Sequence, residues 1–234
     1  MDSLSGARVS GSNSASGSSV SGVGVLDKAV VLLRALRDEG PRALAELHQV
    51  TGLPRATAHR LAVALEEHGL VRRDGSGRFC LGFELIAMGR AAADTFPVAE
   101  LARPLLLRLR DVTGESVQLF VREGDERRCV VSLQSPHGLR WIVPEGARLP
   151  LNIGSAGRVL AGTADSRWIQ SVEEREPGVA SVSAPVLDRD GGMLAAVSVS
   201  GPVERLTREP GKRFGRAVLT CARDLATVLA GSVL

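Results

Sequence analysis

Apolar residues recur at helical spacing in three consecutive runs, over residues 25–37, 44–51 and 54–65. The third run keeps an i, i+3, i+4, i+7 stripe through Ala58, Leu61, Ala62 and Leu65. Pro54 suits the first turn of the third helix, where its missing N–H costs nothing, and Gly52 suits the tight connection before it. The pattern predicts three helices, the last two joined by a short turn.

After these helical runs, the apolar residues recur at the shorter spacing that is typical of strands. Residues 70–73 and 78–81 read as two strands, and the DGSG sequence between them favours a turn. Three helices followed by a hairpin with basic residues are typical of a winged helix-turn-helix. An ordinary helical hairpin with a solvated face is the alternative for residues 44–65 alone. The flanking elements favour the winged domain and, with it, DNA binding.

The free face of the third helix carries small and basic side chains. The N–H groups of its first turn point outward and favour anions, and such a face is what a reader of the DNA major groove requires. The expected base-edge and phosphate contacts of this helix come from Arg55, Ala56, Thr57, His59 and Arg60. The expected wing contacts, to phosphate or to the neighbouring minor groove, come from Arg72, Arg73 and Arg78.

The rest of the chain alternates between helical and strand-like patterns. Helical runs cover residues 83–93, 98–112 and 210–229, and another helix is expected to begin near residue 158. Strand-like runs cover residues 116–122, 127–134, 140–143, 181–187 and 193–200. Helix, antiparallel strands and closing helix together predict an α+β domain in which helices cover a sheet.

The chain is therefore expected to have four parts. Residues 1–22, rich in serine and glycine, are expected to form a disordered tail, and residues 23–82 the winged helix-turn-helix domain. Residues 83–97 are expected to form a linker helix, with packing of its apolar side against a partner subunit as the alternative. Residues 98–234 are expected to form the second domain.

The amino-acid composition of the chain limits the kinds of function that it can have. Aromatic residues make up only 3% of the chain and tyrosine is absent, so base stacking is not the main mode of recognition. The net charge of +3 is modest, and the clustering of arginines points to nucleic acid more than the total does. Cys80, Cys129 and Cys221 lack metal-ligand spacing, which favours reduced thiols in a cytoplasmic protein without a cofactor. Neither a membrane span nor a signal peptide is predicted.

The second half offers no catalytic set. Its one histidine, His137, falls in a Pro-His-Gly turn, and Cys129 and Cys221 read as core thiols. The acidic cluster at residues 173–176 is more typical of a solvated face than of an acid–base pair. A thiol-dependent enzyme fused to the DNA-binding domain is the rival interpretation, and the absence of a His/Cys/acid set argues against it.

Small and hydroxyl-bearing residues stand out instead. The Gly-Ser-Ala-Gly loop at residues 154–157 exposes backbone N–H groups at the start of a helix. Ser181 and Ser183 alternate on one strand, and Ser198 and Ser200 on the next, which places each pair on one face of the sheet. Facing inward, these hydroxyls would line a pocket for a small polar ligand. Solvent exposure and pairing across the strands are the alternatives.

Several stretches resemble the IclR family of bacterial transcriptional regulators and together cover most of residues 22–207. They are GVLDKAVVLLRAL, LPRATAHRLAVALEEHGLV, GRFCLGFELIAMG, LRDVTGESVQLF, LPLNIGSAGRVLAG and EREPGVASVSAPVLDRDGGMLAAVSVSGPVERLT. Within the family, EREPGVASVSAPV and VSVSGPVERLT resemble the NdgR branch, which is associated with amino-acid metabolism. The resemblance implies an N-terminal winged helix-turn-helix and a C-terminal effector-binding domain similar to GAF and PAS folds.

The resemblance also implies effector contacts at matching positions. These are Ser155, Ala156, Ser171, Ser181, Ser198, Val199 and Ser200. Some family members have an acid in place of Ser171 and a cysteine in place of Ser181, which leaves the identity of the ligand open. Between residues 161 and 168 the chain is shorter than is usual in the family. The alternative is therefore a C-terminal domain that only oligomerises and has lost ligand sensing.

Together, the pattern and the resemblance predict a cytoplasmic transcriptional regulator that is not an enzyme. It is expected to act as a repressor or dual regulator of a metabolic operon, with a link to amino-acid metabolism. Its expected partners are double-stranded DNA with a near-palindromic operator, a small organic acid or amino-acid-related effector, and further copies of itself in a homodimer or tetramer. No membrane is expected among its partners.

Overall fold

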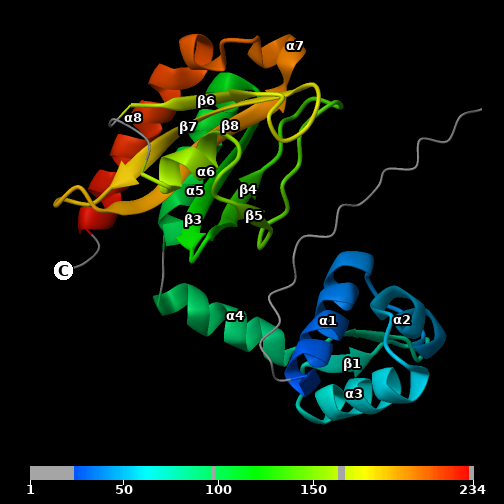
Figure 1. Ribbon diagram of the computed structural model, residues 1–234. Helices are drawn as coiled ribbons and strands as arrows, with labels where there is room; N and C mark the ends of the chain where they lie inside the picture. The colour runs from blue at the N-terminus through cyan, green and yellow to red at the C-terminus, as the bar shows by residue number, and fades with distance from the viewer. Residues whose placement is uncertain (1–23, 96–97, 163–166, 232–234) are drawn as a thin grey trace, which may run out of the picture. The chain divides into compact units, whose positions relative to one another are not determined.

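The computed structural model describes residues 24–95, 98–162 and 167–231, so the expected tail at residues 1–22 lies outside the described chain. The chain separates into two compact units, Met1–Ala92 (unit 1) and Ala93–Leu234 (unit 2) (Figure 1). Each unit has its own hydrophobic core. The division between them falls inside a helix, α4 (Glu84–Thr95).

Unit 1 consists of three helices and a two-stranded hairpin, followed by the start of α4. Its elements are α1 (Gly24–Glu39), α2 (Leu44–Thr51), α3 (Arg55–Glu67), β1 (Val71–Arg73) and β2 (Phe79–Leu81). Gly52 ends α2 with a φ of 66°, a left-handed conformation that glycine adopts without strain. Pro54 lies at the N-cap of α3, one position before the first turn. The predicted winged helix-turn-helix is confirmed.

The core of unit 1 is formed where the helices and the hairpin meet. It consists of Leu32, Leu36, Leu47, Ala62, Leu65, Val71 and Phe79. From the predicted stripe of α3, Ala58 and Ala62 are fully buried, and Leu61 is half-buried. Because this stripe faces the core, the opposite side of α3 faces outward.

Helix α4 lacks a buried side within its described part. Phe83, just before the helix, is 70% exposed, and Ile86 and Met88 are more than half exposed. The guanidinium of Arg72 lies 4.9 Å from the centroid of the Phe83 ring. None of the side chains described for α4 is buried, so the helix presents an apolar surface that its own unit leaves uncovered.

Unit 2 is built on a six-stranded antiparallel sheet in the order β5-β4-β3-β8-β7-β6 (Figure 1). Its strands are β3 (Ser116–Glu123), β4 (Glu126–Leu133), β5 (Arg148–Pro150), β6 (Ile169–Val172), β7 (Val179–Leu187) and β8 (Met193–Pro202). Two long helices, α5 (Val98–Thr113) and α8 (Pro210–Gly231), pack on one face, and α6 (Ser155–Leu160) packs on the other. The one-turn helix α7 (Val203–Leu206) connects β8 to α8. The predicted helix-covered sheet of an α+β domain is confirmed.

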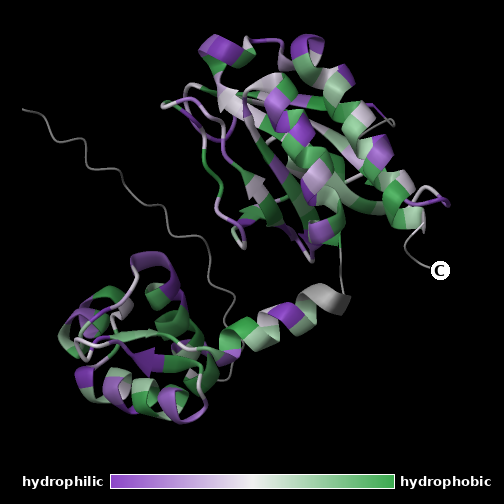
Figure 2. Ribbon diagram, turned by 180° about the vertical axis from the view of Figure 1, so that it is seen from behind, coloured by the Kyte–Doolittle hydropathy of each residue, from purple (hydrophilic) through white to green (hydrophobic). Residues whose placement is uncertain are grey.

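Alternation along the strands separates two hydrophobic cores in unit 2. On β3, Leu119 packs beneath α5 and α8, whereas Phe120 packs on the α6 side. Figure 2 shows hydrophobic and hydrophilic residues in both the strands and the helices of unit 2. The sheet buries apolar residues on both faces, and some polar residues of its strands, such as Gln118 and Ser183, are buried with them.

Three local predictions are wrong. Residues 140–143 do not form a strand; Trp141 and Val143 pack against the core beside α6, and the strand next to β4 is β5. The sequence pattern also misses β5 and β6, because a short edge strand is defined by the partner it pairs with more than by its own period. Helix α6 begins at Ser155, earlier than expected, because Gly154 turns the chain into the helix with a φ of 79°.

Candidate functional site

Helix α3 presents an exposed face of small and basic side chains. Its exposed residues include Arg55, Ala56, His59 and Arg60, whereas Thr57 is half-buried. No side chain caps the N-terminus of the helix, so the N–H groups of its first turn are open to an anionic oxygen. Within the described part of the chain, neither Arg55 nor Arg60 makes an ion pair. Both guanidinium groups are free to bind an external acceptor.

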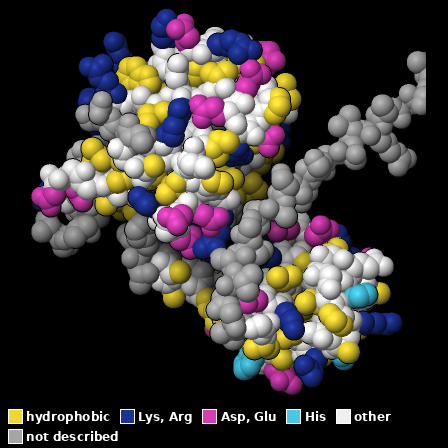
Figure 3. All heavy atoms as spheres, in the orientation of Figure 1, with side chains coloured by type: hydrophobic (Ala, Val, Ile, Leu, Met, Phe, Trp, Pro, Cys, Tyr) yellow, Lys and Arg dark blue, Asp and Glu magenta, His cyan; other side chains and the backbone are white. Residues whose placement is uncertain are grey.

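The three predicted wing arginines, Arg72, Arg73 and Arg78, are all exposed. The Nε of Arg73 donates to Glu66 at 3.3 Å, and Arg78 forms an ion pair with Asp74 at 2.8 Å. Exposed ion pairs contribute only about 0–1 kcal/mol, so phosphate oxygens can compete for both arginines. Figure 3 shows dark blue and cyan side chains, which are basic residues and histidines, projecting from the surface of unit 1.

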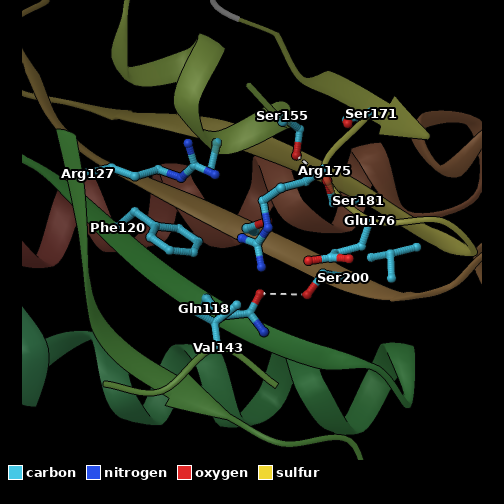
Figure 4. A pocket seen from close by; sticks show the side chains of 14 residues that line it. Gln118, Phe120, Arg127, Val143, Ser155, Ser171, Arg175, Glu176, Ser181 and Ser200 are labelled. Atoms are coloured by element: carbon cyan, nitrogen blue, oxygen red, sulfur yellow. Dashed lines mark hydrogen bonds between the residues drawn. The ribbon is translucent and has the colours of Figure 1, made fainter. Parts of the chain in front are cut away.

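A pocket lies in unit 2 between the sheet and α6 (Figure 4). Its cavity volume is small, about 40 Å³, within a hollow of about 430 Å³ that includes open solvent. Six of the residues that the resemblance assigns to the effector line it: Ser155, Ala156, Ser171, Ser181, Ser198 and Ser200. They come from the N-terminus of α6 and from β6, β7 and β8, so the fold brings together segments that are far apart in sequence.

Val199 is the exception among the expected effector residues. Its side chain is fully buried in the core beneath α5 and α8, on the face of the sheet opposite the pocket. Alternate residues of a strand point to opposite faces, so Ser198 and Ser200 face the pocket while Val199 turns away. The side chain of Val199 therefore does not line the pocket, and the effector contact expected at this position is left to its backbone.

Serine hydroxyls form a connected network at one end of the pocket (Figure 4). The Oγ of Ser155 is hydrogen-bonded to those of Ser181 at 2.7 Å and Ser183 at 2.8 Å. Ser183 in turn donates to Ser198 at 2.9 Å. Ser155, Ser181 and Ser198 line the pocket, whereas the hydroxyl of Ser183 is buried behind them and pairs across the strands. The network ties the start of α6 to β7 and β8.

A buried glutamine adds an unsatisfied donor to the pocket. Ser200 donates to the Oε1 of Gln118 at 2.8 Å, and Gln118 itself is only 1% exposed. The Nε2 of Gln118 has no hydrogen-bond partner. A buried donor left without an acceptor costs about 1–3 kcal/mol, so this amide is ready to donate to a ligand or a water molecule in the pocket.

Two arginines also line the pocket (Figure 4). Arg127 of β4 is 2% exposed, and its Nη1 donates to the backbone carbonyls of Pro150 and, at 2.9 Å, Ile153. Burial, reinforced by the nearby charge of Arg175, lowers the pKa of Arg127 to about 10. Burial also lowers the pKa of Arg175, while the carboxylate of Glu176 opposes that change. The pocket therefore holds two cationic side chains, of which Arg127 is almost fully removed from water.

Sequence reasoning missed several residues of this pocket. They are Gln118, Phe120, Arg127, Val143, Arg175, Glu176 and Val179. The alternation of β3 could have indicated that Gln118 shares a face with Phe120. Arg175 and Glu176 belong to the EREPG sequence that carries part of the family resemblance, but only the tertiary fold turns them toward the pocket.

The described residues hold no recognisable reaction centre. Burial raises the pKa of Cys129 and of Cys221 to about 12, so neither thiol ionises readily. Within residues 24–95, 98–162 and 167–231, no group of three or more histidine, cysteine, aspartate or glutamate side chains could hold a metal ion. No helix in this part of the chain is long and apolar enough to cross a membrane.

A winged helix-turn-helix with an open basic helix and a second domain with a small polar pocket define a DNA-binding regulator of transcription. The particular family follows from comparison with known proteins. The family model described as the IclR helix-turn-helix domain matches residues 25–75, and that of the bacterial transcriptional regulator IclR C-terminal matches residues 90–172 and 160–227. The chain belongs to the IclR family, whose members are transcriptional regulators and not enzymes.

Individual relatives agree with this assignment. The transcriptional repressor IclR of Escherichia coli (strain K12) is 25% identical and covers 82% of this chain and 84% of its own. The HTH-type transcriptional regulator KipR of Bacillus subtilis (strain 168) is also 25% identical, covering 78% and 87%. The solved structure of Thermotoga maritima IclR has a TM-score of 0.70 at 20% identity, over 89% of this chain and 99% of that one.

A second solved structure is an IclR homolog from Microbacterium hydrocarbonoxydans, complexed with 4-hydroxybenzoate. It has a TM-score of 0.70 at 18% identity, over 87% of this chain and 99% of that one. At this level of identity the likeness establishes the shared fold of the two chains.

Proposed function

We propose that the protein binds a near-palindromic operator as a homodimer or tetramer, with α3 of two copies reading half-sites roughly one helical turn apart. The observation that carries this proposal is the exposed set of Arg55, His59 and Arg60 on a helix whose N-terminus no side chain caps. An arginine can donate two hydrogen bonds to a guanine edge in the major groove. Ala56 and Thr57 are small enough to allow α3 close approach to the bases.

Two further observations support this mode of binding. The wing arginines Arg72, Arg73 and Arg78 are exposed beside the hairpin turn, where phosphates of the neighbouring groove would lie. The uncovered apolar residues Phe83 and Ile86 support association with a second copy, since apolar surface of this kind commonly lies at interfaces.

Replacing Arg60 with alanine is expected to weaken specific binding by about 1–3 kcal/mol, with the loss concentrated at one base position. The physical reason is the lost pair of donors to a base edge. An operator obtained by selection from random duplexes, together with its single-base variants, provides the measurement by fluorescence anisotropy. Equal affinity and equal base preference for Arg60→Ala and the wild type would contradict the groove assignment.

Arg72 is the matched comparison because it is an exposed arginine of the wing without an ion pair in the described residues. Arg72→Ala is expected to weaken binding to all duplexes alike and to reduce the slope of log K against log salt by about 1. The contrast between Arg60 and Arg72 separates base reading from phosphate contact.

We further propose that the pocket binds a small organic acid or an amino-acid-related effector and that the regulated genes form a metabolic operon, with amino-acid metabolism as the expected class. The hydroxyl network and the positive charge of the pocket support a small polar ligand over a domain that only oligomerises. Among the relatives are an acetate operon repressor of Salmonella typhimurium (strain LT2), 24% identical, and the 4-hydroxybenzoate complex. Part of the short segment between Ala161 and Trp168, residues 163–166, lies outside the described residues.

Such an effector would act through different affinities for two arrangements of the oligomer. It can change DNA affinity by no more than that difference, typically about 1–3 kcal/mol. Titration of the operator complex with the effector would measure this coupling directly.

Ser198→Ala combined with Ser200→Ala is expected to remove any thermal stabilisation that a ligand confers on the wild type, because both hydroxyls face the pocket. A thermal-shift panel of amino acids, keto acids and aromatic acids provides the measurement. Thr220→Ala, at an exposed position of α8, is the control and should keep the wild-type response. A ligand that stabilises the double variant as much as the wild type would lie elsewhere, and a panel without any binder would favour the oligomerising alternative.

A further inference from the structure

The pocket contains two arginines, Arg127 buried and Arg175 half-buried, whose positive charge the protein neutralises only in part. Within the described residues, neither Arg127 nor Arg175 has a carboxylate within ion-pair distance. Arg127 is 2% exposed, and its Nε lacks any hydrogen-bond partner. An unpaired buried charge is among the most costly features a protein can retain, so a site of this kind is expected to acquire a counter-charge.

Two glycines, Gly154 and Gly157, leave space for the side chain of Arg127. A Cβ placed on Gly157 would lie 2.4 Å from its Nη1, and a Cβ on Gly154 would lie 3.4 Å from its Nη2. Both glycines flank the first turn of α6, and the arginine also donates to the carbonyls of Pro150 and Ile153 in the segment that leads into it. Arg127 thus links the pocket to the position of α6.

Arg175 enters the same pocket from the segment between β6 and β7. Figure 4 shows its side chain pointing into the cavity between Phe120 and Glu176. Its guanidinium lies 5.0 Å from the centroid of the Trp141 ring, which positions it without neutralising it. The two arginines and Glu176 leave the lining with one net positive charge.

We propose that Arg127 and Arg175 form an anion anchor, and that the ligand of this pocket is a monocarboxylate whose carboxylate binds Arg175 and whose second polar group accepts a hydrogen bond from the Nε2 of Gln118. A monoanion matches the single net charge of the lining, and charge-assisted hydrogen bonds between guanidinium and carboxylate are the strongest contacts available there. The amide of Gln118 has no other acceptor. This inference rests on the proposed effector pocket and adds the residues and the charge that select the ligand.

The test compares acids with their neutral analogues on the full-length protein. Acetate, pyruvate, benzoate and 4-hydroxybenzoate, each at millimolar concentration, are paired with their amides, and chloride and phosphate at matched ionic strength serve as inorganic anions. We expect at least one acid to raise the Tm of the wild type, its amide to have no effect, and the inorganic anions to have less effect than the acid. Calorimetry then gives the Kd of that acid.

Arg175→Gln is expected to weaken the Kd of that acid about tenfold or more, the size expected for a hydrogen bond to a charged group. Arg175→Lys should recover part of the loss because it keeps the charge. Arg216→Gln, which removes an exposed arginine of α8 outside the pocket, should bind the acid like the wild type. Circular dichroism of each variant verifies folding.

Three results would overturn the anchor: equal stabilisation by an acid and its amide, an unchanged Kd in Arg175→Gln, or no response of the wild type to any acid. Failure of the proposed function has a different signature. If acids bind in an Arg175-dependent manner but leave operator affinity unchanged, the anchor stands and the effector role does not.

Discussion

Replacing Gly82 with alanine is expected to destabilise unit 1 by about 3 kcal/mol or more and to abolish operator binding with it. A Cβ at this position would lie 1.9 Å from the carbonyl oxygen of Gly69 and 2.8 Å from the carbonyl carbon of Leu70. Both atoms belong to the backbone, and the N–H of Gly82 donates to Leu70 at 2.8 Å, so no side-chain rotation relieves the clash. Thermal and urea unfolding measure the loss.

The matched control is Gly75→Ala, in the turn of the same hairpin. No heavy atom lies within 4 Å of a Cβ placed on Gly75, so the change is expected to stay within about 0.5 kcal/mol. Similar stabilities for the two variants would show that the backbone at Gly69 and Leu70 moves at little cost, contrary to this prediction.

Arg205→Met is expected to destabilise unit 2 by about 3 kcal/mol because it leaves a buried carboxylate without its partner. Arg205 donates to the two carboxylate oxygens of Glu115, at 2.6 and 2.9 Å, and Glu115 is only 3% exposed. The same guanidinium donates to the carbonyl of Leu139 at 2.8 Å, so the variant also loosens that loop. Denaturant unfolding followed by a probe in unit 2 gives the change in free energy.

A double-mutant cycle identifies the cause of the loss. Adding Glu115→Gln to Arg205→Met removes the unpaired charge and should restore part of the stability, while Glu115→Gln alone should cost less than Arg205→Met. If the double variant were no more stable than Arg205→Met, lost packing of the arginine would explain the effect better than the buried charge.

The winged domain was the most predictable part of the fold. Three amphipathic helices and a hairpin follow from spacings of two to four residues, and the buried Ala58 and Ala62 confirm the stripe that orients α3. Arg60 is exposed because it lies opposite that stripe, and Arg55 is exposed in the first turn of the helix, so neither position needed tertiary information. Their contacts to DNA remain a prediction.

The second domain was predictable where its strands are long. Regular alternation identified β7 and β8 and the pocket-facing serines Ser181, Ser198 and Ser200. It failed for the short strands β5 and β6, whose few residues carry too little pattern, and it assigned residues 140–143 to a strand that pairs with nothing. Whether such a short edge segment forms a strand depends on hydrogen bonds to a neighbouring strand, which the sequence does not show.

Local spacing was enough to establish the helices and strands of the winged domain, the outward face of α3 and the alternation of serines on β7 and β8. Each of these depends on residues only a few positions apart along the chain. The folded arrangement was needed to show that Arg127, Arg175 and Gln118 line one pocket and that the side chain of Val199 lies on the other face of the sheet. The charged groups and free donors of a pocket come from segments that are distant along the chain. They affect ligand binding strongly only when folding buries them and removes the water that would otherwise solvate them.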